Sequence, residues 1–174
     1  MRNRDLGPDV DPTVLLSTRL VEAGFPDAVA FMTSRDITRW HSSAARVEGV
    51  EAACLTTVGL SNGERIESRR CARASVGAIN TLARVSHPLT DGALVEAISI
   101  IAEARTAVML ETRRSEDGPR ITGTGTDCIV VASPCEGEPA SCAGLHTAVG
   151  EAIGAAVYRA TREGVEQWEA ENAV

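Results

Sequence analysis

The chain contains no lysine, and all 17 of its basic residues are arginine. This absence excludes any mechanism that uses a Schiff-base lysine or a lysine general base. Aromatic residues make up only 3% of the 174 residues, so a core must be built from Ala, Val, Ile and Leu. Apolar residues still amount to 44% of the chain, which is enough for a folded domain.

Positive charge is also scarce, since the formal net charge is −7. A protein that binds nucleic acid needs a basic surface, and so does one that docks on anionic lipid. No apolar stretch approaches the length of a membrane span, and residues 1–10 lack the apolar core of a signal peptide. We therefore predict a cytoplasmic protein with neither a nucleic acid nor a membrane as partner.

The five cysteines do not have the spacing of a zinc site. Cys128, Cys135 and Cys142 follow one another at intervals of seven residues, and no pair of histidines lies near them. An odd number of cysteines without a signal peptide is typical of free thiols in a reducing compartment. The sequence thus predicts no metal site and no cofactor.

Short apolar runs bounded by turn residues predict strands. The clearest is a hairpin between Trp40 and Leu60, a stretch rich in Val, Ala and Thr that Glu48-Gly49 interrupts. The other predicted strands cover residues 28–33, 74–86 and 128–132. Together they indicate a mixed sheet of about five strands.

Two long helices are predicted from apolar residues at helical spacing. The first runs over about 93–111 and is apolar on nearly every side, so it should be largely buried. The second runs over about 147–163, with Gly164 just after its end.

A short helix is expected over 12–23, capped by Asp11 or Thr13. Helices packed on a mixed sheet give a fold of the α+β or α/β class. We expect a flexible leader at residues 1–11 and a single domain over 12–174.

The run Gly123-Thr124-Gly125-Thr126-Asp127 stands directly before the predicted strand 128–132. It leads into a strand and not onto a helix N-terminus, so it is not a usual phosphate loop. Spacing alone favours a Gly-rich turn with Asp127 as a capping residue. The alternative is a site where bare backbone approaches a ligand and Asp127 supplies a carboxylate at the strand edge.

His146 begins the last predicted helix and shares a face with Gly150 and Gly154. Each glycine inside a helix costs about 1 kcal/mol relative to alanine, so something must be gained there. One interpretation, which helical spacing favours, is a seam of close packing with His146 as a cap. The other is room for a bulky ligand beside the imidazole.

Two further polar residues fall in apolar surroundings. Glu103 lies in the buried-looking helix, either on a water-facing stripe with Glu96 and Ser99 or held inside the protein, where desolvation would raise its pKa. Asn80 lies inside a predicted strand, where asparagine is depleted. Its amide is either a structural anchor or a contact to a ligand.

Several of these stretches, in this order, resemble the adenosylcobinamide amidohydrolase family. The matching stretches are Thr56-Thr57-Val58-Gly59-Leu60-Ser61-Asn62, Gly77-Ala78-Ile79-Asn80-Thr81, Glu103-Ala104-Arg105-Thr106-Ala107, Thr122-Gly123-Thr124-Gly125-Thr126-Asp127, Val130-Val131-Ala132, Ala143-Gly144-Leu145-His146-Thr147 and Gly150-Glu151. Members of the family often carry lysine where this chain has Arg105 and Leu145, so no lysine-specific role carries over.

The resemblance implies an enzyme of corrinoid salvage. The family hydrolyses the amide between the corrin propionyl side chain and aminopropanol in adenosylcobinamide. The products are 1-amino-2-propanol and adenosylcobyric acid, which re-enters cobamide (vitamin B12) synthesis. Such a hydrolysis needs an activated nucleophile, a stabilised oxyanion and a proton for the leaving amine. The expected partner is the corrinoid substrate, and a homo-oligomer stays open.

The expected catalytic residues are Asp127 or Glu103 as the base that activates water and His146 as the acid that protonates the amine. A threonine nucleophile at 124 or 126 is left open. Backbone N–H groups near Gly123 to Thr126 would hold the oxyanion. The expected substrate-binding residues are Thr57, Asn62, Asn80, Gly123, Thr124, Gly125 and Thr126. The alternative to an enzyme is an inactive corrinoid-binding or regulatory protein of the same fold.

Overall fold

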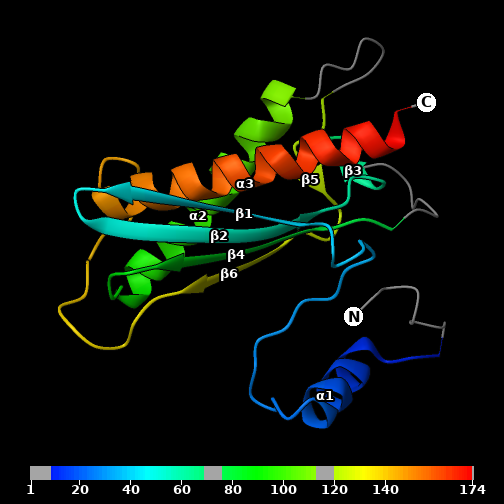
Figure 1. Ribbon diagram of the computed structural model, residues 1–174, viewed down its shortest axis with the longest axis horizontal. Helices are drawn as coiled ribbons and strands as arrows, with labels where there is room; N and C mark the ends of the chain where they lie inside the picture. The colour runs from blue at the N-terminus through cyan, green and yellow to red at the C-terminus, as the bar shows by residue number, and fades with distance from the viewer. Residues whose placement is uncertain (1–8, 69–75, 113–119, 174) are drawn as a thin grey trace.

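The computed structural model describes residues 9–68, 76–112 and 120–173. Two long helices lie against one face of a four-stranded sheet, and a two-stranded sheet lies at one end (Figure 1). The large sheet has the order β1 (Trp40–Val47), β2 (Val50–Val58), β4 (Ile79–Val85) and β6 (Cys128–Ala132). The small sheet pairs β3 (Gly63–Glu64) with β5 (Gly123–Thr124). The helices are α1 (Pro12–Glu22), α2 (Asp91–Thr112) and α3 (Ala148–Asn172).

The sequence left the α+β and α/β classes open; this arrangement is α+β, and it confirms the predicted mixed sheet with two long helices packed on it. Neighbouring strands are antiparallel except for β4 and β6, which run parallel. The predicted hairpin is confirmed as β1 and β2. Glu48 and Gly49 form its turn with φ of 48° and 88°. Positive φ at both turn residues suits the right-handed twist of the paired strands.

The inner face of the sheet forms the core with α2 and α3. Alternate residues of β2 and β4 are buried there, as the two-residue period of a strand requires. α3 packs on β1 and β2, while α2 packs on α3 and β6. The buried side chains are mostly Ala, Val and Ile, in line with the scarcity of aromatic residues. Burial raises the pKa of the Cys54 thiol to about 12, so this cysteine packs as a neutral side chain.

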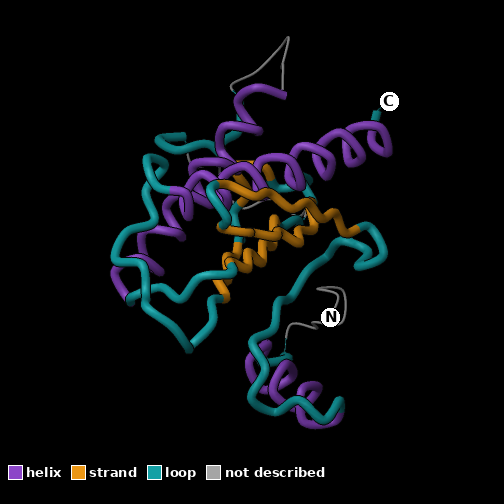
Figure 2. Tube along the Cα trace, turned by 60° about the vertical axis from the view of Figure 1, so that its left-hand side comes forward, coloured by secondary structure: helices purple, strands orange, loops and turns teal. Residues whose placement is uncertain are grey.

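The sheet has four strands because residues 28–33 do not form the expected fifth one. This segment runs along the outer face of the sheet, the face away from α2 and α3 (Figure 2). The carbonyl of Met32 accepts a hydrogen bond from Asn80 Nδ2 at 2.9 Å. The apolar run therefore lines a cavity over the outer face and forms no strand of the sheet. The expected strand 74–86 begins only at Ile79, and residues 69–75 lie outside the described part.

The last helix is longer than expected. α3 continues through Gly164 to Asn172, so the prediction that Gly164 follows the helix end is wrong. Gly164 is buried where α3 crosses β2, and this contact explains the glycine. The end of α3 also binds the segment before β1, because Arg35 and Arg39 contact the Glu171 carboxylate at 2.7 and 2.9 Å.

α1 begins where the sequence predicted. Asp11 caps it by accepting hydrogen bonds from the N–H groups of Thr13 and Val14. The helix has no buried residue and lies apart from the sheet (Figure 2). Residues 1–8 of the expected leader fall outside the described part. Within the described ranges, no helix has the length and apolar character to cross a membrane.

We predict opposite effects for two Gly-to-Ala changes in α3. A Cβ at Gly164 would lie 2.5 Å from Cγ2 of the buried Val58, whereas one at Gly154 would lie at an ordinary 3.4 Å from Leu145 Cδ2. Gly164→Ala should lower the free energy of unfolding by about 1–3 kcal/mol through overpacking. Gly154→Ala should raise it by up to about 1 kcal/mol through helix propensity. Urea unfolding measures both, and a stabilising Gly164→Ala would contradict the packing.

Candidate active site

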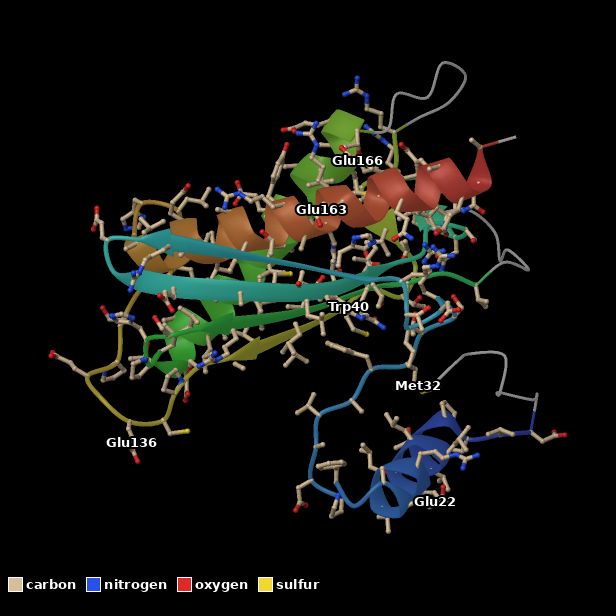
Figure 3. The ribbon with its side chains drawn as sticks, viewed as in Figure 1. Glu22, Met32, Trp40, Glu136, Glu163 and Glu166 are labelled. Carbon is tan, nitrogen blue, oxygen red and sulfur yellow. The ribbon has the colours of Figure 1, made fainter. Side chains whose placement is uncertain are left out.

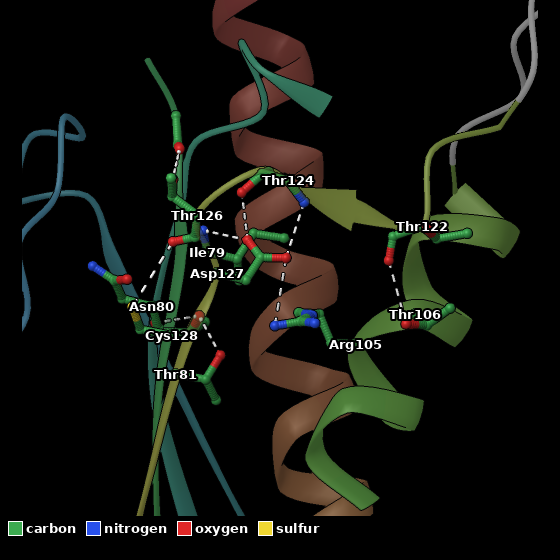
Figure 4. A network of polar contacts seen from close by, with 12 residues as sticks. Ile79, Asn80, Thr81, Arg105, Thr106, Thr122, Thr124, Thr126, Asp127 and Cys128 are labelled. Atoms are coloured by element: carbon green, nitrogen blue, oxygen red, sulfur yellow. Dashed lines mark hydrogen bonds and ion pairs between the residues drawn. The ribbon is translucent and has the colours of Figure 1, made fainter. Parts of the chain in front are cut away.

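Three stretches that are distant in sequence meet at one end of the large sheet. β2 ends where its antiparallel neighbour β4 begins, and β6 begins beside β4 because the two are parallel. Three segments therefore lie together at this end of the sheet, which we call the site edge: the loop after β2, the residues before β4 and the Gly-rich run before β6. Figure 4 shows Thr124, Thr126 and Asp127 together there, with Arg105 of α2 facing Asp127.

Asp127 is the centre of this cluster. Its Oδ1 accepts hydrogen bonds from the Ile79 N–H at 3.0 Å and from the Thr124 hydroxyl. Its Oδ2 accepts from the Thr124 N–H at 2.9 Å and lies 3.5 Å from Arg105 Nη1 (Figure 4). Only 10% of the Asp127 side chain is exposed. One carboxylate thus links the start of β4, the Gly-rich run and α2.

Two glycines allow the backbone to come this close. A Cβ at Gly123 would lie 2.6 Å from Asp127 Oδ2, and one at Gly77 would lie 2.5 Å from Asn62 Oδ1. Thr126 secures the same region, because its hydroxyl donates to the Gly77 carbonyl at 2.6 Å. Gly125 is exposed and has more room, since a Cβ there would lie 3.6 Å from Asn62 Nδ2.

Several buried polar atoms near the site edge have no hydrogen-bond partner within the described residues. They are Thr57 Oγ1, Asn62 Oδ1, Asn80 Oδ1 and Arg105 Nε. A buried polar atom without a partner costs about 1–3 kcal/mol, so a hydrogen bond from a ligand or water would stabilise each of these atoms. Three of the four residues, Thr57, Asn62 and Asn80, are expected substrate-binding residues.

Thr57 and Asn80 also line a cavity of about 620 Å³ on the outer face of the sheet. We call it the sheet-face cavity. Leu55, Leu82 and Val130 form its floor, and the segment 29–37 covers it. Figure 3 shows Met32 on that segment and Trp40 where it enters β1.

Glu103 does not occupy the buried position that a desolvated base requires. It is exposed on α2, so the expectation that it is held inside the protein is wrong. It lines a groove of about 370 Å³ between α2 and α3, together with Glu151, Tyr158 and Arg159. The water-facing interpretation of this helix stripe holds for Glu103.

His146 lies at the other end of α2 from the Asp127 cluster. It is exposed and precedes Thr147, the N-cap of α3. A Cβ at Gly144 would lie 3.0 Å from both His146 Cε1 and Glu96 Oε1. Glu96 and Arg105 are nine residues apart, which is about 14 Å along a helix. The structure therefore does not bring Asp127 and His146 together as an acid/base pair.

Gly150 serves close packing and does not leave room for a ligand beside His146. A Cβ there would lie 2.1 Å from the Gly144 carbonyl oxygen, so the glycine lets the loop before α3 pass close to the helix. This contact supports the packing-seam interpretation for Gly150 but not for Gly154, where a Cβ would make only ordinary contacts.

Comparison with known proteins identifies the family. The model of the adenosylcobinamide amidohydrolase family matches residues 2–173. The chain belongs to this family. It is 32% identical over 167 residues to a Halobacterium salinarum protein described as adenosylcobinamide amidohydrolase, covering 89% of this chain and 67% of the relative. It is 37% identical over 101 residues to an uncharacterized Methanocaldococcus jannaschii protein, covering 56% of this chain and 39% of that one. No solved structure matches the chain.

In this member of the amidohydrolase family, Arg105 is the residue that sequence reasoning missed. The sequence analysis noted only that members of the family often carry lysine at this position. The available indication was a guanidinium flanked by Ala104 and Ala107 in a helix expected to be largely buried, since a buried guanidinium needs a partner. Among the described residues, no group of three or more His, Cys, Asp or Glu side chains is arranged to hold a metal ion.

We predict that Asp127→Asn destabilises the fold of this amidohydrolase family member. The amide nitrogen cannot accept the hydrogen bonds that one carboxylate oxygen accepts, and Arg105 loses its counter-charge. The free energy of unfolding should fall by about 2–4 kcal/mol. Glu103→Gln, the same change on an exposed carboxylate, should stay within about 0.5 kcal/mol of wild type. An unchanged urea midpoint for Asp127→Asn would refute the linking role.

Proposed function

We propose that the protein hydrolyses the aminopropanol amide of adenosylcobinamide, releasing adenosylcobyric acid and 1-amino-2-propanol in corrinoid salvage. Family membership over residues 2–173 supports the reaction class. The site is proposed from one observation. Three separate stretches that resemble the family, containing Ile79, Thr124 and Arg105, all contact the Asp127 carboxylate. The reaction site is proposed at the site edge.

The proposed nucleophile is the Thr124 hydroxyl. Sequence reasoning left water, Thr124 and Thr126 open. Thr124 Oγ1 donates its hydrogen bond to the Asp127 carboxylate, which is the arrangement of a nucleophile beside its base. Thr126 Oγ1 instead donates to the Gly77 carbonyl, which is a far weaker base.

In the proposed reaction, Thr124 Oγ1 attacks the amide carbonyl carbon while its proton passes to Asp127. The C–N bond then breaks as Asp127 returns this proton to the amine nitrogen, and 1-amino-2-propanol leaves. Water then attacks the carbonyl carbon of the Thr124 ester while Asp127 accepts one of its protons. The C–O bond to Thr124 breaks, and Asp127 returns this proton to Thr124 Oγ1 as adenosylcobyric acid leaves. The chemistry of these steps balances without a metal or a redox partner.

Arg105 is proposed to stabilise the oxyanion. Its Nε–H is buried and has no partner among the described residues, and the guanidinium lies beside Asp127. A preorganised donor of this kind contributes most where water is excluded. The Thr124 N–H, which the sequence suggested for this task, is already bound to Asp127 Oδ2. The sequence assigned the amine proton to His146, but His146, in the loop before α3, is too remote from the Asp127 cluster to deliver it in this scheme.

The first test is the reaction itself. Incubation of the purified protein with adenosylcobinamide should release 1-amino-2-propanol in step with adenosylcobyric acid, as measured by mass spectrometry. The Thr124→Val protein serves as the matched control. A folded wild-type protein that binds adenosylcobinamide and leaves it intact would instead be a corrinoid-binding protein of the same fold.

The second test separates the catalytic residues. Thr124→Val should lower turnover per folded molecule by about 10²- to 10⁴-fold, whereas Thr124→Ser, which keeps a hydroxyl, should retain much of it. His146→Ala should stay within about tenfold of wild type, because it is remote from the Asp127 cluster. The opposite result, an active Thr124→Val and an inactive His146→Ala, would return the acid/base role to His146.

A further inference from the structure

The outer face of the sheet carries an apolar surface that α2 and α3 do not cover. Leu55, Leu82 and Val130 are register neighbours on β2, β4 and β6, so they form a continuous row across three strands. Trp40 and Phe31 close the sides of the sheet-face cavity. Its volume of about 620 Å³ is within the range of small-molecule sites, which is about 300–1,000 Å³.

Two polar residues interrupt this apolar lining. Thr57 and Asn80 are cross-strand partners next to the apolar row, and both line the cavity. Asn80 is only 4% exposed. Neither Thr57 Oγ1 nor Asn80 Oδ1 has a partner within the described residues.

The orientation of the Asn80 amide follows from its one hydrogen bond. Nδ2 donates to the Met32 carbonyl at 2.9 Å, and a carbonyl oxygen can only accept. The Asn80 oxygen is therefore left as the group that needs a donor. The cavity thus suits a ligand with an apolar body and an N–H group at its rim, and it disfavours a carboxylate, which would bring oxygen against oxygen.

A corrinoid has this chemistry, because its methylated ring carries neutral carboxamides around the rim. We propose that the sheet-face cavity binds the edge of the corrin ring and that Thr57 and Asn80 accept hydrogen bonds from one rim carboxamide. The proposal rests on the proposed function for the identity of the ligand. Position supports it as well: the residue before Asn80 is Ile79, whose N–H binds Asp127 at 3.0 Å, so the cavity adjoins the proposed reaction site.

The test removes one hydroxyl and compares it with a matched one elsewhere. Thr57→Val deletes Oγ1 from the cavity at nearly constant shape. Thr161→Val makes the same change on α3, where the hydroxyl is also buried and unpartnered among the described residues but does not line the cavity. Thr57→Ser keeps the hydroxyl as a conservative variant.

Calorimetric titration with dicyanocobinamide, which carries the rim carboxamides and the aminopropanol, measures the dissociation constant. Thr57→Val should raise it roughly 2- to 12-fold, the loss of one hydrogen bond. Thr161→Val and Thr57→Ser should stay within about twofold of wild type by the same measure. Cobyrinic acid has carboxylates in place of the carboxamides, so its dissociation constant for wild type should be higher than that of dicyanocobinamide. In Thr57→Val the ratio of these two dissociation constants should be smaller.

The outcomes separate this inference from the proposed function. Equal dissociation constants for wild type and Thr57→Val, together with normal release of aminopropanol, would overturn the cavity assignment alone. Binding that depends on Thr57 without any release of aminopropanol would overturn the hydrolase and leave the cavity assignment standing. A folded wild-type protein that does not bind dicyanocobinamide would overturn the cavity assignment.

Discussion

The Asp127 carboxylate is the interaction on which the end of the sheet depends. It accepts hydrogen bonds from β4 and from the Gly-rich run, and it faces Arg105 of α2. A charge with so little exposure is tolerated only when hydrogen bonds and a counter-charge replace its hydration. Gly123 must be a glycine because of the same carboxylate. The geometry of the candidate site and the local stability of the fold are therefore coupled.

The large sheet separates two surfaces with different tasks. Its inner face packs on α2 and α3 through small aliphatic side chains and is closed. Among the described residues, the segment before β1 lies over the outer face, and the Asn80 side chain on β4 donates a hydrogen bond to its Met32 carbonyl. A sheet that packs helices on one side can keep the other for a ligand. The amide of Asn80 sits where this outer face adjoins the Asp127 cluster.

The stretches that resemble the family lie in different places: some on the two faces of the sheet and some along the groove between α2 and α3. Thr57, Asn80 and Val130 line the sheet-face cavity, whereas Glu103 and Glu151 line the groove between α2 and α3. A single small active site therefore does not account for all the stretches that resemble the family. Close packing accounts for part of it, since Gly150 admits the backbone of Gly144.

The sequence by itself determined the family, a mixed sheet with two long helices packed on it, the hairpin turn at Gly49 and the strand at 128–132, because these depend on local periodicity, turn chemistry and ordered motifs. Only the tertiary structure decided that residues 28–33 lie over the outer face of the sheet and form no fifth strand, and that Gly164 lies inside α3. It also showed that Glu103 is exposed and that His146 is remote from Asp127. Burial, cross-strand register and the partner of each polar atom arise from contacts between distant segments, and local sequence does not encode them.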